Sequence, residues 1–433
     1  MSRMLGLFMV MPVLAVAATE LDGFSPLMLG LAIGGYGLTQ AILQIPMGML
    51  SDKIGRKQVI VLGLSFFALG SVIAALADNM LMLVLGRVLQ GAGAIAGAVM
   101  ALAADSTRVE QRTKVMAIIG VSIGLSFYIA IIVGPMFSAV AGLSGLFWLT
   151  AIFAMVSVFL VLFAVPTVKE QHPTGEVLPK RQQLSALISQ PDLLKLNISV
   201  ALLHMMITVL FVNLPVKLTS IGFSLPSHWQ FYAPVFAVSL VLLGGYMQVA
   251  KRIKTSVAIQ LPIVCLLIAF WGFGFAPLST LSLTLFTLIF FVGFNFLEAR
   301  FPALVSVIAP AGARGSAMGI YASFQFMGAF LGGIFSGTLS SWFAPQTLYA
   351  VLITLCVIWL GLFFRFFGHT HLKRVTLALE SSYSSAEDVK QALAHLQGVI
   401  EIKPALAEGV VYLKVDPMFD QQKAKQALAN EKN

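Results

Sequence analysis

The decapeptide Gly48-Met-Leu-Ser-Asp52-Lys-Ile-Gly55-Arg56-Lys57 decides the fold, because it is a densely charged segment between two long apolar runs. The runs on either side, 27–50 and 58–77, are each long enough to cross a bilayer as a helix, which takes about 20 residues. The two glycines of the decapeptide allow a turn without a side-chain clash, and its three basic side chains are typical of a short cytoplasmic loop. The stretch therefore predicts a tight turn between two membrane helices.

The composition of the whole chain is that of an integral membrane protein. Of its 433 residues, 58% are hydrophobic and 10% are charged, whereas a soluble domain has about 25% charged residues. The net charge of +9 comes mostly from Lys and Arg in short loops beside apolar runs, so it does not indicate a nucleic-acid partner. Cys265 and Cys356 lie inside apolar runs, without a C-x-x-C pair or a histidine cluster, so no disulfide, metal site or cofactor is expected.

The apolar runs predict an all-α membrane protein with twelve transmembrane helices. They lie at about 4–19, 26–50, 58–77, 79–104, 115–141, 145–165, 194–216, 229–249, 256–276, 278–308, 315–340 and 345–367. The loops on one side carry Lys53, Arg56, Lys57, Arg108, Arg112, Lys114, Lys169, Lys180, Arg181, Lys195, Lys251, Arg252, Lys254, Arg314, Lys373 and Arg374. The loops on the other side carry Lys217. Because basic loops stay in the cytoplasm, both termini are predicted to be cytoplasmic.

A polar segment with three prolines divides these helices into two sets of six. We expect an N-terminal half at 1–165, a cytoplasmic linker at 166–193, a C-terminal half at 194–368 and a small cytoplasmic domain at 369–433. Two such halves with a binding site between them, near the middle of the membrane, are typical of secondary transporters.

Two motifs resemble those of the major facilitator superfamily. The pattern G-x-L-S-D-x-x-G-R-K at 48–57 is similar to its signature loop between helices 2 and 3, and Arg87-Val-Leu-Gln90-Gly91 is similar to its R-x-x-Q-G motif. The resemblance implies the major facilitator fold, with two six-helix halves, and a transporter rather than an enzyme. In that family the arginine of the second motif is associated with proton coupling.

The resemblance also implies a conformational latch at the cytoplasmic side. It places Arg56 against Asp105 and directs Asp52 at the start of the run 315–340, near Gly315. We use the word latch for this set of residues: Gly48, Asp52, Gly55, Arg56, Lys57 and Asp105. The latch would join the two halves only when the cytoplasmic side is closed.

Four polar residues inside the apolar runs are candidates for proton coupling: Arg87, Gln90, His204 and Glu298. A buried carboxyl group favours its neutral form, which makes Glu298 a candidate proton carrier with His204 as its partner. Two alternatives stay open. Arg87 could be a structural arginine bonded to carbonyl groups, and Arg300 could reach the interface while Glu298 makes one structural hydrogen bond.

Arg3 stands close to the start of the first run. If the first helix begins upstream of Met1, Arg3 lies partway into the membrane, where an arginine is costly and usually functional. Otherwise it is a basic flank whose long side chain reaches the interface. The sequence leaves both options open.

The wall of a central cavity is expected to be aromatic and amide-bearing. The candidates are Tyr36, Gln40, Gln44, Tyr128, Tyr232, Trp271, Tyr321 and Gln325. Gly134-Pro135 adds a kink and resembles part of an antiporter motif of the family, although other glycines of that motif are replaced here. Such a wall suits a moderately apolar solute, including a cationic one that is held by cation–π contacts.

Five pairs of glycines at i, i+4 spacing predict close helix contacts, because small residues let backbones approach in a membrane. The pairs are Gly30/Gly34, Gly93/Gly97, Gly120/Gly124, Gly328/Gly332 and Gly333/Gly337. We expect some of them to be sliding surfaces between the halves, with static packing as the alternative.

The tail from residue 371 has the pattern of a small soluble domain. Alternating and helical spacings predict the order β-α-β-β-α, which is a ferredoxin-like unit without its last strand. Metal-binding domains of this topology need two cysteines that are absent here, so His369 and His371 are expected to be solvated linker residues. A domain of about 60 residues has a small core, so it should lean on the membrane part or on a second copy.

A superfamily core with such a tail resembles a group of bacterial proton-driven, drug-efflux-like antiporters. The expected function is therefore export of a small amphipathic solute in exchange for protons, across the cytoplasmic (inner) membrane. The expected partners are this solute, protons and lipid, and the chain is expected to be monomeric, with self-contact through the tail as an option. The alternative is a sensor in which the tail binds a ligand and the helical core transports little.

Overall fold

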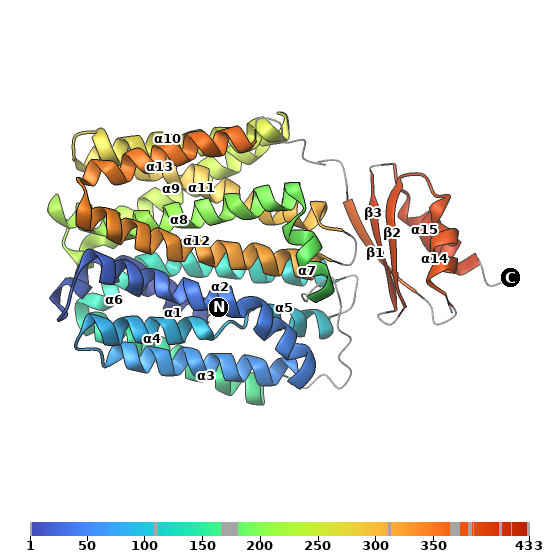
Figure 1. Ribbon diagram of the computed structural model, residues 1–433, viewed down its shortest axis with the longest axis horizontal. Helices are drawn as coiled ribbons and strands as arrows, with labels where there is room; N and C mark the ends of the chain where they lie inside the picture. The colour runs from blue at the N-terminus through green and yellow to red at the C-terminus, as the bar shows by residue number, and fades with distance from the viewer. Residues whose placement is uncertain are drawn as a thin grey trace.

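The structure is a computed structural model that describes residues 2–107, 111–165, 181–310, 313–363, 373–379, 383, 385–406, 409–416 and 418–430. The helical part precedes a small domain with a three-stranded sheet (Figure 1). Its helices are α1 Ser2–Ala17, α2 Pro26–Ile54, α3 Arg56–Ala75, α4 Met80–Ala92, α5 Ala96–Asp105, α6 Arg112–Phe163, α7 Arg181–Ile188, α8 Pro191–Ser220, α9 His228–Ala250, α10 Thr255–Phe275, α11 Thr280–Ile308, α12 Arg314–Trp342 and α13 Pro345–Leu362.

Eleven stretches of the described residues are long and apolar enough to cross a membrane, where twelve are predicted. The difference lies in α6, whose 52 residues cover the two runs expected at 115–141 and 145–165. Within α6, Gly142 has non-helical angles (φ 66°, ψ −170°), and two helices meet there. Glycine tolerates this positive φ, so the chain can change direction without a connecting loop. A second break, at Gly93–Ile95, separates α4 from α5 within one expected run.

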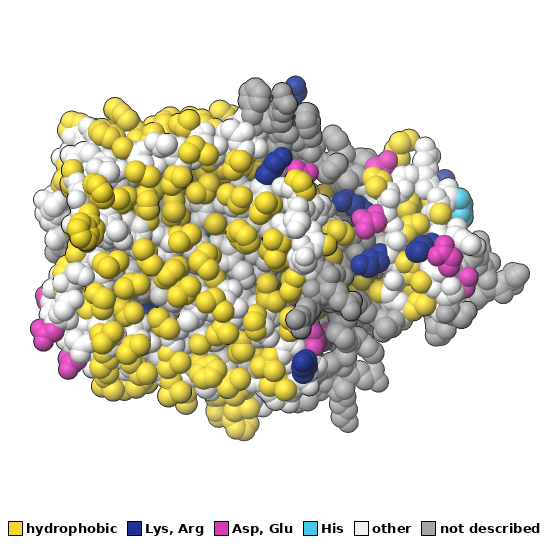
Figure 2. All heavy atoms as spheres, viewed as in Figure 1, with side chains coloured by type: hydrophobic (Ala, Val, Ile, Leu, Met, Phe, Trp, Pro, Cys, Tyr) yellow, Lys and Arg dark blue, Asp and Glu magenta, His cyan; other side chains and the backbone are white. Residues whose placement is uncertain are grey.

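The surface of the helical part is apolar, as a lipid-facing surface must be. Figure 2 shows hydrophobic side chains over most of the visible face of the helices, with charged side chains gathered toward the two ends. We call the end that carries the turn 48–57 the loop end, and the opposite end, where α2 begins at Pro26, the far end.

The two halves touch through glycines on α2 and α12, which lie side by side in the middle of the helical part (Figure 1). A Cβ at Gly30 would stand 2.1 Å from the carbonyl oxygen of Gly333, and one at Gly337 would stand 2.5 Å from that of Pro26. Closer to mid-membrane, a Cβ at Gly37 would meet the carbonyl oxygen of Phe326 at 2.6 Å. The backbones therefore touch from the far end to the middle of the bundle.

We expect Gly333→Val to separate the halves at the far end. A Cβ at position 333 would lie 2.3 Å from the carbonyl oxygen of Gly30, and overpacking of this kind costs about 1–3 kcal/mol. Spin labels on the far ends of α2 and α12 should report a longer mean distance. The matched control is Gly244→Val on α9, where a Cβ meets nothing within 4 Å. Equal distance distributions in the Gly333→Val variant and the wild type would contradict the expectation.

The other predicted glycine pairs divide into two kinds. Gly328 and Gly332 pack against the backbone of α8 within the C-terminal half, where an added Cβ would lie 2.0 and 2.5 Å from the nearest carbonyl oxygen. Gly93 packs on Gly63, but its partner Gly97 meets nothing closer than 3.7 Å. Gly120 and Gly124 make no close contact in this conformation, because a Cβ at either position meets nothing within 4 Å. Spacing alone cannot tell which face of a helix has a neighbour.

The tail has the predicted element order, with strands β1 Lys373–Ala378, β2 Val399–Ala405 and β3 Val410–Val415 and helices α14 Ala386–Ala394 and α15 Gln421–Asn430. The sheet order is β1-β3-β2 with antiparallel pairs. The helices cover one face of the sheet, and the other face is turned toward the helical part (Figure 1). Their shared core is built from Leu377, Val389, Leu393, Val411, Leu413, Ala424 and Leu428. The ferredoxin-like classification itself stays a prediction.

The tail leans on the membrane part. Lys414 Nζ on β3 donates a hydrogen bond of 3.3 Å to the carbonyl oxygen of Ile308, the last residue of α11. A cation is favoured at the C-terminus of a helix by the free carbonyl groups and the helix dipole. Several predicted features fall outside the described residues: most of the linker (166–180), His369 and His371, and the loop residues Arg108, Lys169 and Lys180.

Candidate functional site

The turn 48–57 is as tight as its glycines allow. Helix α2 ends at Ile54 and α3 begins at Arg56, so Gly55 alone makes the turn, with a φ of 106° that favours glycine. Lys57 Nζ donates to the carbonyl oxygens of Leu162 and Val165, at 2.9 and 3.0 Å, and so binds the C-terminal end of α6. The turn thereby fixes the loop ends of α2, α3 and α6 relative to one another.

Arg56 is the centre of this turn, and only 2% of its side chain is exposed. Its Nε donates to Asp105 Oδ2 at 3.1 Å, and its Nη1 donates to Asp52 Oδ1 at 2.5 Å and to Ser51 Oγ at 3.1 Å. The guanidinium group is thus buried with two carboxylates, which offset its desolvation. All of these partners belong to the N-terminal half. The hydrogen bond of Asp52 in the described residues is to Arg56, and its predicted approach to Gly315 stays a prediction.

Arg87 and Gln90 lie on α4 and are buried, with 2% and 0% of each residue exposed. Arg87 donates from Nε to the carbonyl oxygen of Ala32 at 3.0 Å and from Nη1 to Gln90 Oε1 at 2.7 Å. Gln90 Nε2 in turn donates to Ser71 Oγ at 2.7 Å. The guanidinium carbon of Arg87 also lies 5.3 Å from the centre of the Tyr36 ring. Ser71 is a partner that the sequence did not indicate, because a lone serine in an apolar run has no signature.

Arg3 lies in the same cluster. Arg3 is 6% exposed, and its Nη2 donates hydrogen bonds to Tyr36 Oη at 2.7 Å and to Gln40 Oε1 at 3.0 Å. Gln40 Nε2 continues to Gln44 Oε1 at 2.9 Å, so a chain of hydrogen bonds runs along α2 toward the loop end. The side chain of Arg3 is thus buried among polar groups of α2. We call Arg3, Tyr36, Gln40, Gln44, Arg87 and Gln90 the arginine cluster.

A second cluster joins three helices of the C-terminal half: His204 on α8, Glu298 on α11 and Gln325 on α12. Gln325 Nε2 lies 2.7 Å from His204 Nε2 and 3.3 Å from Glu298 Oε1, and His204 Nε2 lies 3.7 Å from Glu298 Oε2. His204 Nδ1 is 3.2 Å from the carbonyl oxygen of Val200. The two candidate proton carriers thus share one amide neighbour, and we call these three residues the His–Glu cluster.

The two clusters meet on α12. Gln325 belongs to the His–Glu cluster, and the next residue, Phe326, packs edge-on against Tyr36 of the arginine cluster with the ring centres 6.2 Å apart. A direct polar contact also joins the halves, because Tyr128 Oη on α6 donates to Asn295 Oδ1 on α11 at 2.8 Å. The structure therefore gathers polar groups of both halves along α11 and α12.

The remaining predicted wall residues have different settings. Tyr321 is 2% exposed and its hydroxyl group has no hydrogen-bond partner among the described residues. Tyr232 is fully buried and stacks on Phe236, so it belongs to the core. Trp271 is 52% exposed on α10, where it contacts Phe286, and the structure does not bring it to either cluster.

Gly134-Pro135 lies inside α6, whose departure from helical angles falls at Gly142 instead. Gly134 instead allows a close contact between two helices. A Cβ at position 134 would stand 2.4 Å from the carbonyl oxygen of Met9, so Gly134 lets α1 and α6 pack closely.

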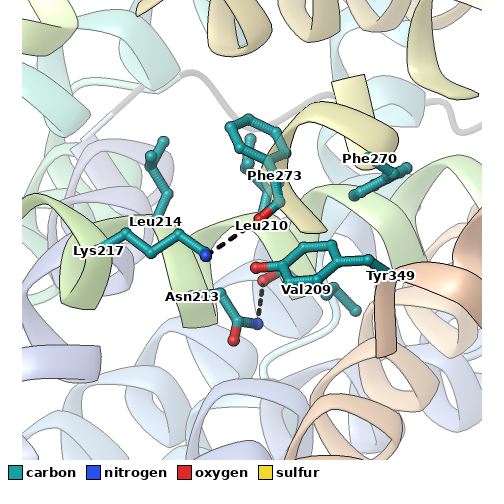
Figure 3. A pocket seen from close by; sticks show the side chains of 8 residues that line it. All are labelled: Val209, Leu210, Asn213, Leu214, Lys217, Phe270, Phe273 and Tyr349. Carbon is teal, nitrogen blue, oxygen red and sulfur yellow. Dashed lines mark hydrogen bonds between the residues drawn. The ribbon is translucent and has the colours of Figure 1, made fainter. Parts of the chain in front are cut away.

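Lys217, the basic residue predicted on the opposite side, borders a small pocket at the far end of α8 (Figure 3). Its Nζ donates to the carbonyl oxygen of Phe273 at 3.1 Å and lies 5.2 Å from the centre of the Tyr349 ring. Phe273 is in the last turn of α10, so the ammonium group binds a helix C-terminus. The cavity holds about 10 Å³, roughly the space of one water molecule, which makes this pocket a structural contact rather than a ligand site.

Comparisons with known proteins agree with this architecture. The family model of the Major Facilitator Superfamily matches residues 1–308. The inner membrane transport protein YajR of Escherichia coli (strain K12) is 38% identical over 421 residues, which cover 96% of this chain and 91% of that protein. The class B tetracycline resistance protein of Escherichia coli is 32% identical over 165 residues, or 37% of this chain and 40% of that protein.

Solved transporters share the fold at lower identity. A bacterial homologue of the human lysosomal transporter Spinster, inward-facing and occupied, superposes with a TM-score of 0.62 at 17% identity, covering 84% of this chain and 94% of that one. The nucleoside transporter NupG gives a TM-score of 0.60 at 15% identity, covering 84% and 98%. The chain is therefore a multi-pass membrane transporter, not an enzyme, and belongs to the Major Facilitator Superfamily.

Proposed function

We propose that the protein is a proton-coupled secondary transporter that exports a small amphipathic solute across the cytoplasmic membrane by alternating access. The observation that carries the proposal is the His–Glu cluster. Glu298 is the only Asp or Glu within residues 196–308 and 314–363, and it lies beside a histidine that can also take up a proton. A carboxyl group in a membrane helix is expensive, which favours a functional role over a structural one.

The contacts between the halves support alternating access. Backbones of α2 and α12 touch at the far end. Toward the loop end, in contrast, four glycines of α6 and α9 would have no neighbour within 4 Å of an added Cβ: Gly120, Gly124, Gly244 and Gly245. We infer that this conformation is closed at the far end and open at the loop end. A transporter must also adopt a conformation that is open at the far end and closed at the loop end. Close-packed glycines allow this change, because two helix backbones can separate there and pack together again.

The proposal includes twelve spans with both termini in the cytoplasm. Divided at Gly142, α6 gives two helices of at least about 20 residues, each long enough to span a bilayer. The basic residues of the turn 48–57 put the loop end in the cytoplasm by the positive-inside rule. The conformation would then face inward.

Reconstituted protein tests the proposal directly. Vesicles with an internal pH indicator and an imposed pH gradient are exposed to candidate solutes, including tetracycline, and proton movement is recorded. We expect at least one solute to dissipate the gradient through the wild-type protein and none to do so through protein-free vesicles. Solute uptake with no accompanying proton movement would disprove the coupling.

The second candidate is a sensor, favoured by the contact between Lys414 of the tail and the end of α11. A ligand of the tail could alter this contact and so act on the C-terminal half. Removal of residues 373–433 separates the candidates. A transporter with a regulatory tail should keep solute-dependent proton movement, with a changed rate, whereas a sensor has none to keep.

A further inference from the structure

The membrane interior of this protein has an excess of positive charge. Residues 2–19, 26–50, 56–77, 80–104 and 113–165 of the N-terminal half contain no Asp or Glu, yet they bury Arg3 and Arg87. Glu298, the one Asp or Glu within residues 196–308 and 314–363, lies beside His204 in the other half. Two guanidinium groups in the N-terminal half are thus buried without a carboxylate.

The hydrogen bonds of these two arginines go to neutral groups. Arg87 donates to a carbonyl oxygen and to Gln90, and Arg3 donates to Tyr36 and Gln40. Arg3 Nε is buried and has no acceptor within the described residues. Burying a charge is costly unless it is paired, and a buried N–H without an acceptor adds to that cost. Within the described residues, the arginine cluster therefore lacks an anion.

The cluster is equally unsuited to a cation. Tyr36 is the aromatic ring at its centre, and the guanidinium carbons of Arg3 and Arg87 lie 6.0 and 5.3 Å from the centre of that ring. Arg3 also lies 5.3 Å from the centre of the Phe67 ring. The protein's own cations hold the positions that a cationic solute would take by cation–π contact. The electrostatic repulsion of two arginines would oppose it further.

We propose that the arginine cluster binds the negative group of the solute, so that the transported molecule is an amphipathic organic anion such as a carboxylate or sulfonate. Arg3 is the main contact, because its guanidinium group has an unused donor and its present acceptors, Tyr36 and Gln40, are neutral and can be replaced. A guanidinium group matches the two oxygens of a carboxylate in a way that an ammonium group does not. Phe326, which is partly buried beside the cluster, offers an apolar contact for the rest of the molecule.

This inference deepens the proposed function, because it names the charge of the solute, but its test does not require transport. Three probes with one apolar body and different charges are compared: 4-phenylbutyrate, 4-phenylbutylamine and 4-phenylbutyramide. Their dissociation constants are measured by calorimetry with purified full-length protein in neutral detergent, without anionic lipid. We expect the carboxylate to bind at least about tenfold more tightly than either of the other probes.

Variants of the full-length chain assign this preference to Arg3. Arg3→Gln should reduce the preference for the carboxylate to less than about twofold. Arg3→Lys keeps the positive charge but not the paired N–H donors of a guanidinium group, so it should keep part of the preference. The matched control is Lys217→Gln, which removes a half-buried cation with neutral partners and should leave the preference unchanged. Melting temperatures show whether each variant is folded.

Three results would overturn the inference: no binding of the carboxylate, equal binding of the amine or the amide, or an unchanged preference in Arg3→Gln. Because no proton gradient is present, anion binding can be found even if proton-coupled export fails in vesicles. Conversely, export can hold while the anion preference is absent. The two proposals therefore fail independently.

Discussion

Replacement of Glu298 by Gln is expected to abolish the pH dependence of transport while the protein remains folded. The wild-type rate should vary at least about tenfold across the pH range measured, and the variant should vary less than about twofold. Gln keeps the size of Glu and one carbonyl acceptor for Gln325, so the hydrogen bond of 3.3 Å can persist. Initial rates in vesicles, measured from pH 5.5 to 8.5, check this expectation.

The geometry of the cluster explains why Glu298 and His204 should act together. In neutral His204, Nδ1 can donate to the carbonyl oxygen of Val200, which leaves Nε2 as the acceptor for Gln325. A proton that binds Nε2 turns that nitrogen into a hydrogen-bond donor. The carboxylate of Glu298, with Oε2 3.7 Å away, can accept this hydrogen bond. The amide of Gln325 then has to turn its oxygen toward the histidine. Proton uptake thus rearranges the contact between α8, α11 and α12.

Another histidine, His228, provides the control. His204→Gln should reproduce the loss of pH dependence, whereas His228→Gln should not, because His228 is fully buried on α9 and its neighbour is the carbonyl oxygen of Phe223. If Glu298→Gln keeps the wild-type pH profile, Glu298 makes a structural hydrogen bond only. That is the alternative left open by the sequence.

The fold could be predicted from the sequence because the bilayer leaves few choices. Backbone polar groups in lipid must be bonded within the segment, so each long apolar run becomes a helix. The turn at Gly55 follows from a local motif, whereas the pairing of Arg56 with Asp105, at 3.1 Å in the structure, is implied by the resemblance to the superfamily. The order of the tail elements also follows from local periodicity.

Contacts between distant segments could not be predicted in the same way. The bond between Tyr128 and Asn295 joins residues 167 positions apart, and no periodicity selects one tyrosine from eight. The two helices of α6 meet at Gly142 without a connecting loop, and this junction depends on the backbone angles of that one residue. The residue type of Trp271 favours a place in the cavity wall, although helix orientation decides which side such a residue faces. In a membrane helix, apolar residues cover the whole circumference, so hydrophobicity gives little indication of that orientation.

The structure sharpens the latch hypothesis. Arg56 and Asp105 are paired inside the N-terminal half, with 2% and 4% of their side chains exposed, while Asp52 is 27% exposed. The N-cap of α12, Ala313, provides no side-chain cap for the first turn of that helix. We expect Arg56, itself held by Asp105, to keep Asp52 in position, so that Asp52 binds this helix N-terminus when the loop end closes. A carboxylate there is worth about 0.3–1 kcal/mol, or up to about 2 kcal/mol when partly buried.

We therefore expect Asp52→Asn, Arg56→Lys and Asp105→Asn each to shift the population toward the form that is open at the loop end. A change of about 1.4 kcal/mol alters the ratio of the two forms about tenfold, which spin labels on the loop ends of α2 and α12 would record. The Arg56 and Asp105 variants should be non-additive, because either one breaks the same pair. They should also lower the melting temperature more than Asp52→Asn, since removing one member of a buried pair costs about 3–5 kcal/mol. If all three variants keep the wild-type distances, the turn only anchors the helices and the latch does not exist.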